Sequence, residues 1–229
     1  GSSLVGSEMC IRDRIMIAFQ SMTKEVVMPE EFIAGNPKKG AELVADCAAC
    51  HGQNGIGLSS DWPNLAGQNQ KYLYDQLKYF QSGQRENVLM TTVIDYLKIL
   101  SDEDIRDIAA FYADKSSNIG AAKNDEELLA LGSQLYKAGD FKRGIPSCSA
   151  CHSIYGQGND QAGFPAVNGQ QKGYLVSTLK AYRSGQRNAG EYSKVMQAVS
   201  MNLTDRDIEA LANYCLLYTS DAADEVDGV

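Results

Sequence analysis

The stretch Cys47-Ala48-Ala49-Cys50-His51 recurs as Cys148-Ser149-Ala150-Cys151-His152, at an offset of 101 positions (148 − 47). The chain has only two histidines among its 229 residues, and each directly follows a Cys-x-x-Cys pair. This arrangement indicates that two thiols and one imidazole form a chemical unit that is present twice.

The sequence around the two motifs is also repeated. Residues 62–68 match residues 164–170 at an offset of 102 (164 − 62). A period near 100 residues with drifting offsets predicts two homologous domains rather than a solenoid of short repeats. Further matched segments are Tyr72-Leu73 with Tyr174-Leu175, Leu77-Lys78 with Leu179-Lys180, 82–85 with 184–187, and 101–105 with 204–208.

Each half has the apolar spacing and the capping residues of α-helices, and no segment has a convincing strand pattern. An all-α fold is therefore expected, with residues 115–120 as the linker between the halves. We expect helices that begin at Asn36-Pro37 and Asn124-Asp125 and run toward the motifs, helices over 69–82 and 171–184 that stop at Gly83 and Gly185, and last helices capped by Ser101 and Thr204 with Asp104 and Asp207 three residues later.

The Cys-x-x-Cys-His spacing is the attachment signal of a c-type haem. The two thiols can form thioethers with two vinyl groups on one haem edge, and the adjacent histidine can coordinate the iron. A thioredoxin-type redox pair would need a βαβ setting, and a zinc site would need four ligands where each motif supplies three. Small helical units also have few apolar residues for a core, so a large apolar group is expected to complete each one. We therefore predict two covalent haems.

The chain has no further histidine for the distal side of either iron. Because His51 and His152 are used as proximal ligands, a second histidine would have to come from another chain. A methionine, a weaker donor or an open position remains.

The chain resembles the di-haem cytochromes c of the cytochrome c4 type over about residues 36–214. The resemblance rests on both Cys-x-x-Cys-His motifs, the Pro-x-Leu/Val-x-Gly-Gln segments, the Tyr-Leu and Gly-Gln-Arg pairs and the Leu-Ser/Thr-Asp helix starts. It implies a tandem duplication of the class I cytochrome c fold, with one covalent haem per domain. It also implies that the carbonyls of Pro63 and Pro165 accept a hydrogen bond from the proximal histidines.

Met196 fits the distal methionine of that family, since it lies seven residues before Leu203. Met90 lies seven residues before Leu97, but the first half carries three extra residues before Ser101, and strict register with the capping motif would point to Val93. We favour Met90 because it is the only methionine between the two motifs, and the extra residues should then form a longer turn between Leu97 and Ser101. Met201 is an alternative in the second half. Arg85 and Arg187 could pair with haem propionates or be solvated charges at helix ends.

Both termini resemble a translated sequencing adapter, since Met9 to Asp13 and Cys215 to Thr219 can be encoded by opposite strands of one DNA element. We expect 1–14 and 215–229 to be adapter-derived tails, 29–116 to be the first domain, and 117–214 to be the linker and second domain. Leu216 and Leu217 could still prolong the last helix, while Cys10 and Cys215 should not form a disulfide. Removing the C-terminal tail changes the formal charge from −8 to −4 (−8 + 4).

The excess of acidic over basic residues argues against nucleic-acid binding. The sequence also lacks a run of eighteen apolar residues, which would predict a transmembrane segment. The resemblance implies a soluble periplasmic electron carrier, not an enzyme, that passes single electrons to redox partner proteins such as a terminal oxidase, with peripheral membrane association possible. Two alternatives remain. One is a di-haem subunit of a redox enzyme such as a flavin-dependent sulfide dehydrogenase, and the other is a di-haem peroxidase, which would need an open iron position.

Overall fold

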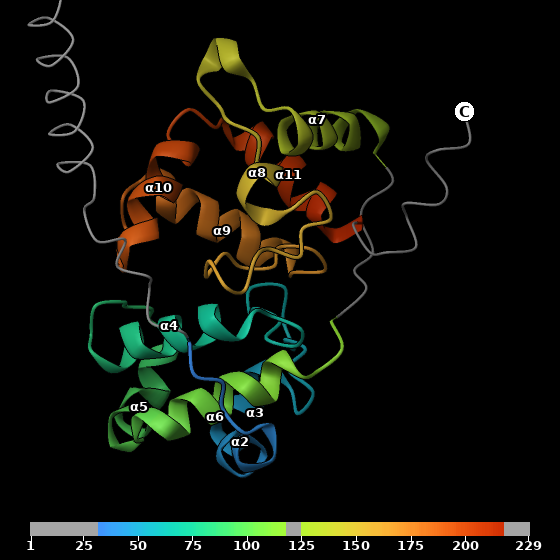
Figure 1. Cartoon of the computed structure of the whole chain (residues 1–229). Helices are drawn as coiled ribbons and strands as arrows, with labels where there is room; N and C mark the ends of the chain where they lie inside the picture. The colour runs from blue at the N-terminus through green and yellow to red at the C-terminus, as the bar shows by residue number, and fades with distance from the viewer. Residues whose placement is uncertain (1–31, 118–124, 218–229) are drawn as a thin grey trace, which may run out of the picture. The chain divides into compact units, whose positions relative to one another are not determined.

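The computed structural model describes residues 32–117 and 125–217, and both ranges are built of α-helices (Figure 1). Within them, β-structure is limited to isolated bridges between Asp140 and Ile145 and between Asn159 and Phe164, so the predicted all-α fold is confirmed. The first half contains α2 (Pro37–Leu43), α3 (Ala45–His51), α4 (Gln70–Gln81), the 3-10 helix η1 (Met90–Val93), α5 (Ile94–Ile99) and α6 (Asp102–Ala113). The second half contains α7 (Glu126–Lys137), the 3-10 helix η2 (Phe141–Arg143), α8 (Ser149–His152), α9 (Lys172–Arg183), α10 (Glu191–Ser200) and α11 (Asp205–Leu217).

The predicted helix starts are present with their caps. The side chains of Asn36 and Asp125 accept hydrogen bonds from backbone N–H groups at the starts of α2 and α7. Ser101 forms a complete capping box with Asp104, and Thr204 makes the same pair of bonds with Asp207. α4 and α9 are each capped at the C-terminal end by a serine, Ser82 or Ser184, and the next residue, Gly83 or Gly185, has positive φ, as the sequence predicts.

The two helices expected to run from Asn36-Pro37 and Asn124-Asp125 toward the motifs are interrupted before they reach them. Val44 separates α2 from α3, and a ten-residue loop (138–147) separates α7 from the Cys148 motif. Gly139 and Gly144 adopt positive φ in that loop, and Pro146 follows them, so the helix cannot propagate.

The three extra residues of the first half also differ from expectation. We expected a longer turn after Leu97, but α5 continues to Ile99 and only Leu100 is extended. The insertion is thus absorbed by helix, and Leu97 is buried against Phe80 and Ile105.

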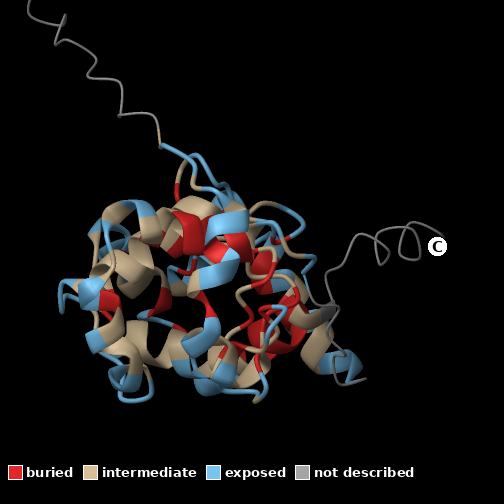
Figure 2. Cartoon of the chain, turned by 90° about the horizontal axis from the view of Figure 1, so that it is seen from below, coloured by how far each residue is buried: buried red, intermediate tan, exposed pale blue. Residues whose placement is uncertain are grey.

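Each half has its own core, formed where its first helix crosses its last. Figure 2 colours the buried residues of the described chain red. The apolar stripe of α6 is buried against α2, and that of α11 against α7. Gly40 and Gly132 lie at these crossings, where a Cβ would overlap the carbonyl oxygens of Asp107 and Ala210 respectively. The two last helices are therefore held close to the helices that lead toward the motifs.

The end of α11 extends through Leu216 and Leu217, as anticipated. Cys215 is a free, buried cysteine whose carbonyl accepts a hydrogen bond from the Gly169 N–H. Cys10, residues 1–14 and residues 218–229 lie outside the described residues. Within the described residues, none of the helices has the length and apolarity needed to cross a bilayer.

Candidate haem-attachment sites

Both motifs lie on short helices that end at the histidine. α3 ends at His51 and is followed by Gly52 at φ 69°, while α8 ends at His152 and is followed by Ser153 at φ 65°. Ser153 is the only non-glycine residue with positive φ in the described ranges. A serine at this position stores backbone strain of about 1–2 kcal/mol, which indicates that the chain reversal after the histidine is strongly required there.

None of the four motif cysteines forms a disulfide in the structure. Cys47 and Cys148 pack against the cores of their halves, and burial raises the pKa of Cys47 to about 11 and that of Cys148 to about 12. A thiol of a redox-active pair needs a lowered pKa to attack as thiolate. The environment therefore argues against a thioredoxin-type site.

The two histidines occupy equivalent buried sites. Nδ1 of His51 donates a hydrogen bond to the Pro63 carbonyl at 2.8 Å, and Nδ1 of His152 donates one to the Pro165 carbonyl at 2.9 Å. Burial lowers the pKa of both rings, although these bonds oppose the shift. With the proton held at Nδ1, the lone pair of Nε2 is the one that can bind iron. The hydrogen bond implied by the family resemblance is thus present in both halves.

The methionines lie on other elements. Met90 begins η1 and packs against the cluster of Phe80, Leu97 and Ile105, while Met196 lies within α10 and is half-buried. Met201 is 64% exposed, which disfavours it as a ligand. The structure does not test whether Met90 and Met196 bind iron, so their ligation stays a prediction.

Arg187 is buried rather than solvated, which excludes the helix-end interpretation for this residue. Its guanidinium donates to Tyr72 Oη at 2.8 Å, Gln76 Oε1 at 3.1 Å and Tyr174 Oη at 3.2 Å. No ion pair in the described ranges involves Arg187, so its charge has no carboxylate counterpart there. Burial would raise the pKa of Tyr174, but Arg187 and Arg85 outweigh it and lower that pKa to about 7. A propionate would supply the counter-charge that this group lacks.

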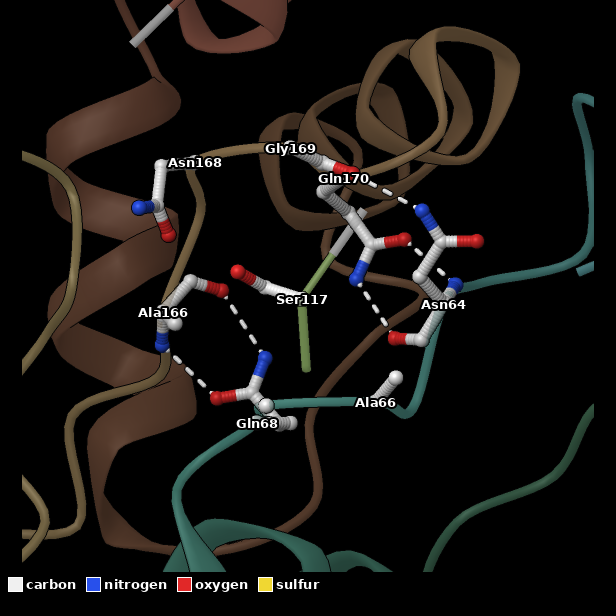
Figure 3. A pocket seen from close by; sticks show the side chains of 9 residues that line it. Asn64, Ala66, Gln68, Ser117, Ala166, Asn168, Gly169 and Gln170 are labelled. Carbon is white, nitrogen blue, oxygen red and sulfur yellow. Dashed lines mark hydrogen bonds between the residues drawn. The ribbon is translucent and has the colours of Figure 1, made fainter. Parts of the chain in front are cut away.

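The sequence did not reveal the roles of Gln68 and Gln170, which served only to align the repeats. Each carboxamide forms two hydrogen bonds with one residue of the other half (Figure 3). Gln170 is paired with the backbone of Asn64, and Gln68 with that of Ala166. The two pairs are related by the repeat offset of 102 (166 − 64 and 170 − 68), so the contact is reciprocal. This contact could not be predicted from the sequence, because the bonded residues are about 100 positions apart in the chain.

The residues present fit a covalently held haem. Each half offers two thiols and one imidazole whose Nδ1 is already engaged, which is the donor set that c-type attachment uses. A zinc site is not supported, since no cluster of three metal-ligating side chains forms within the described residues.

Comparison with known proteins agrees with this chemistry. The family model for cytochrome c matches residues 37–113 and again residues 129–216. The cytochrome c4 of Stutzerimonas stutzeri is 36% identical over 190 residues, a match that covers 79% of this chain and 88% of the relative. A thiosulfate dehydrogenase electron acceptor of Thiomonas intermedia is 35% identical over 172 residues and is matched over 77% of its length, by 74% of this chain.

The fold has a close counterpart among solved structures. The crystal structure of reduced recombinant cytochrome c4 from Pseudomonas stutzeri superposes with a TM-score of 0.75 at 36% identity. The match covers 81% of this chain and 100% of that chain. Both halves and their order along the chain are therefore shared with that structure.

Proposed function

The chain belongs to the cytochrome c family as a di-haem protein of the cytochrome c4 type, and from that premise we propose which residues hold its two haems. It carries two covalently attached c-type haems, one in each half, and it is an electron carrier rather than an enzyme. When bound, each haem iron takes up and releases one electron. The protein's task is to hold the iron, set its potential and limit access to it.

In the proposed sites, Cys47 and Cys50 attach the first haem and Cys148 and Cys151 the second. His51 and His152 are the proximal iron ligands, oriented through Nδ1 by Pro63 and Pro165. Met90 and Met196 are the distal ligands. A thioether favours Fe(II) relative to a second imidazole, so this ligand set supports a high potential and closes both irons to exogenous ligands.

The observation that carries the proposal is the pair of buried histidines with Nδ1 committed to a proline carbonyl. A histidine that merely filled a core would not be expected to recur with the same bond, directly after two thiols, in both halves. This geometry fixes the tautomer and makes the ring a stronger ligand.

The attachment is tested by mass spectrometry of protein matured in a haem-attaching host. We expect two haems that survive acid denaturation, and a mass equal to the bare chain with four free thiols would refute the proposal.

The distal ligands are tested by the near-infrared band of Met-ligated ferric haem. Met90→Ala and Met196→Ala should each halve it and open one iron to carbon monoxide, while the exposed Met201→Ala serves as the matched control. An undiminished band in Met90→Ala would show that our register is wrong.

We propose that the protein works in the periplasm and delivers electrons to a terminal oxidase. The similarity to cytochromes c4 supports this, and such a carrier acts together with redox partner proteins. Rapid oxidation of the reduced carrier by purified oxidase, at a rate that falls with salt if charges guide docking, would support the assignment. Failure to be oxidised at any ionic strength would contradict it.

A second function is favoured by one relative. The Thiomonas intermedia protein is described as the electron acceptor of thiosulfate dehydrogenase, which fits a carrier dedicated to one redox enzyme. Stable copurification with a catalytic chain, such as a thiosulfate or flavin-dependent sulfide dehydrogenase, would favour this alternative over a diffusing carrier. Carbon monoxide binding by the unmodified reduced protein would instead favour a peroxidase with an open iron.

A further inference from the structure

The peptide group that receives each histidine proton is also bonded from its other side. The Pro63 carbonyl accepts from His51, and the N–H of the same peptide group, on Asn64, donates to Oε1 of Gln170 at 2.7 Å. In the second half the Pro165 carbonyl accepts from His152, and the Ala166 N–H donates to Oε1 of Gln68, also at 2.7 Å. Each glutamine thus reaches the histidine of the opposite half through one peptide group.

The glutamine side chains cannot easily rotate out of this arrangement. Nε2 of Gln170 donates to the Asn64 carbonyl at 2.9 Å, and Nε2 of Gln68 donates to the Ala166 carbonyl at 2.8 Å. The second bond fixes which end of each carboxamide faces the N–H group. Asn64, Gln68 and Gln170 are all at most 6% exposed, so water does not compete strongly for these bonds.

Hydrogen bonds in such a chain strengthen one another. An acceptor on the peptide N–H increases the negative charge on the peptide oxygen, which becomes a better acceptor for the imidazole N–H. The imidazole then carries more negative charge and is a stronger donor to iron. A stronger donor favours Fe(III), so the bond from the far half should lower the potential of the haem.

We propose that Gln170 is a positioning residue for the first haem and Gln68 for the second, each setting the potential of the haem in the opposite half. The inference rests on the proposed role of His51 and His152 as iron ligands. Because the bonds are reciprocal, separation or distortion of the contact between the halves would raise both potentials.

Gln170→Met and Gln68→Met test the proposal, because methionine keeps the side-chain length but accepts no comparable bond. We expect Gln170→Met to raise the Fe(II)/Fe(III) ratio of the first haem by about threefold at a fixed solution potential. For a one-electron couple this equals a rise of ~28 mV in the midpoint potential of that haem, and the second haem should change less. Gln68→Met should show the reverse. The potential of each haem is followed through the haem methyl resonances assigned to its half.

The chain supplies matched controls at the neighbouring residues. Asn69 donates to the Phe164 carbonyl at 2.6 Å, and Gln171 donates to the Gly57 carbonyl at 3.0 Å. Asn69→Ala and Gln171→Ala therefore remove contacts between the halves but keep the glutamine oxygens that accept from the Asn64 and Ala166 N–H groups. If these variants shift the potentials as much as the glutamine variants, a general loosening explains the effect and the proposal fails.

A second readout follows the histidines directly. In the reduced protein, the Nδ1–H proton resonance of His51 should move upfield in Gln170→Met while that of His152 stays in place. Gln170→Glu keeps an acceptor for the Asn64 N–H and should retain the downfield resonance. An unchanged His51 resonance in Gln170→Met, in a protein that still shows two Met-ligated haems, would overturn this inference alone. Loss of histidine ligation in the unmodified protein would overturn the proposed sites instead.

Discussion

Arg143→Met removes the cation that ties the loop before Cys148 to the last helix. Its guanidinium contacts the Asp207 carboxylate through Nη1 at 2.7 Å and Nη2 at 3.1 Å, and Nε contacts Asp140 at 2.7 Å. Asp207 is 3% exposed and also forms the capping box of α11 with Thr204. The substitution therefore leaves a buried carboxylate without its counter-charge.

The cost follows from this geometry. Charge-assisted bonds contribute about 1.5–3 kcal/mol, and because the Arg143 side chain is 37% exposed we discount the loss to about 1–2 kcal/mol at neutral pH. Denaturant unfolding measures the loss of stability. Hydrogen exchange of the amides in α7 and α11 locates this loss in the second half, with the amides in α2 and α6 as the internal reference. Lys142→Met is the matched control, since it removes an equal charge from an exposed neighbour.

The effect should depend on pH in a defined direction. Burial opposes ionisation of Asp207, but hydrogen bonds from Arg143 and Thr204 outweigh burial and hold its pKa below the usual value. A carboxylate with a lowered folded-state pKa stabilises the fold above its unfolded pKa of about 3.9, and this contribution is lost as the pH falls through the folded value. The difference between Arg143→Met and the unmodified protein should therefore shrink below about pH 4. An equal loss in Lys142→Met, or a difference that grows on acidification, would refute the reasoning.

Four further outcomes are expected. Gly132→Ala should destabilise the second half by about 1–3 kcal/mol and Gly40→Ala the first, because a Cβ overlaps the crossing helix; hydrogen exchange of each half measures this. Arg187→Gln should raise the pKa of Tyr174 above about 7, seen by NMR of labelled tyrosine, and an unchanged value would contradict the contact. Replacing Cys47 and Cys50 with alanine should remove one haem by mass and leave the second half's spectrum intact. Deleting residues 1–14 should leave the unfolding midpoint unchanged, and a lower midpoint would contradict the adapter interpretation.

Features that depend on residues close together in the chain could be predicted from the sequence alone. The spacing of Cys47, Cys50 and His51 suffices to recognise haem attachment, since the thiols and the imidazole must lie within one turn of helix. Capping boxes at Ser101 and Thr204 and the stops at Gly83 and Gly185 act over three or four residues, and the structure contains them where the pattern predicts. The repeat added the two-domain organisation, because it needs only self-comparison.

The groups that surround these local units could not be predicted from the sequence and are known only from the folded protein. Arg187 could not be distinguished from a solvated arginine until Tyr72 and Tyr174, from different halves, were found against it. The helical form of the insertion after Leu97 accompanies burial of that side chain against Phe80 and Ile105, which belong to two other helices. The bonds from Gln68 and Gln170 join residues about 100 positions apart. No periodicity or spacing encodes such partners, because the free energy of these bonds exists only when both halves have folded and excluded water.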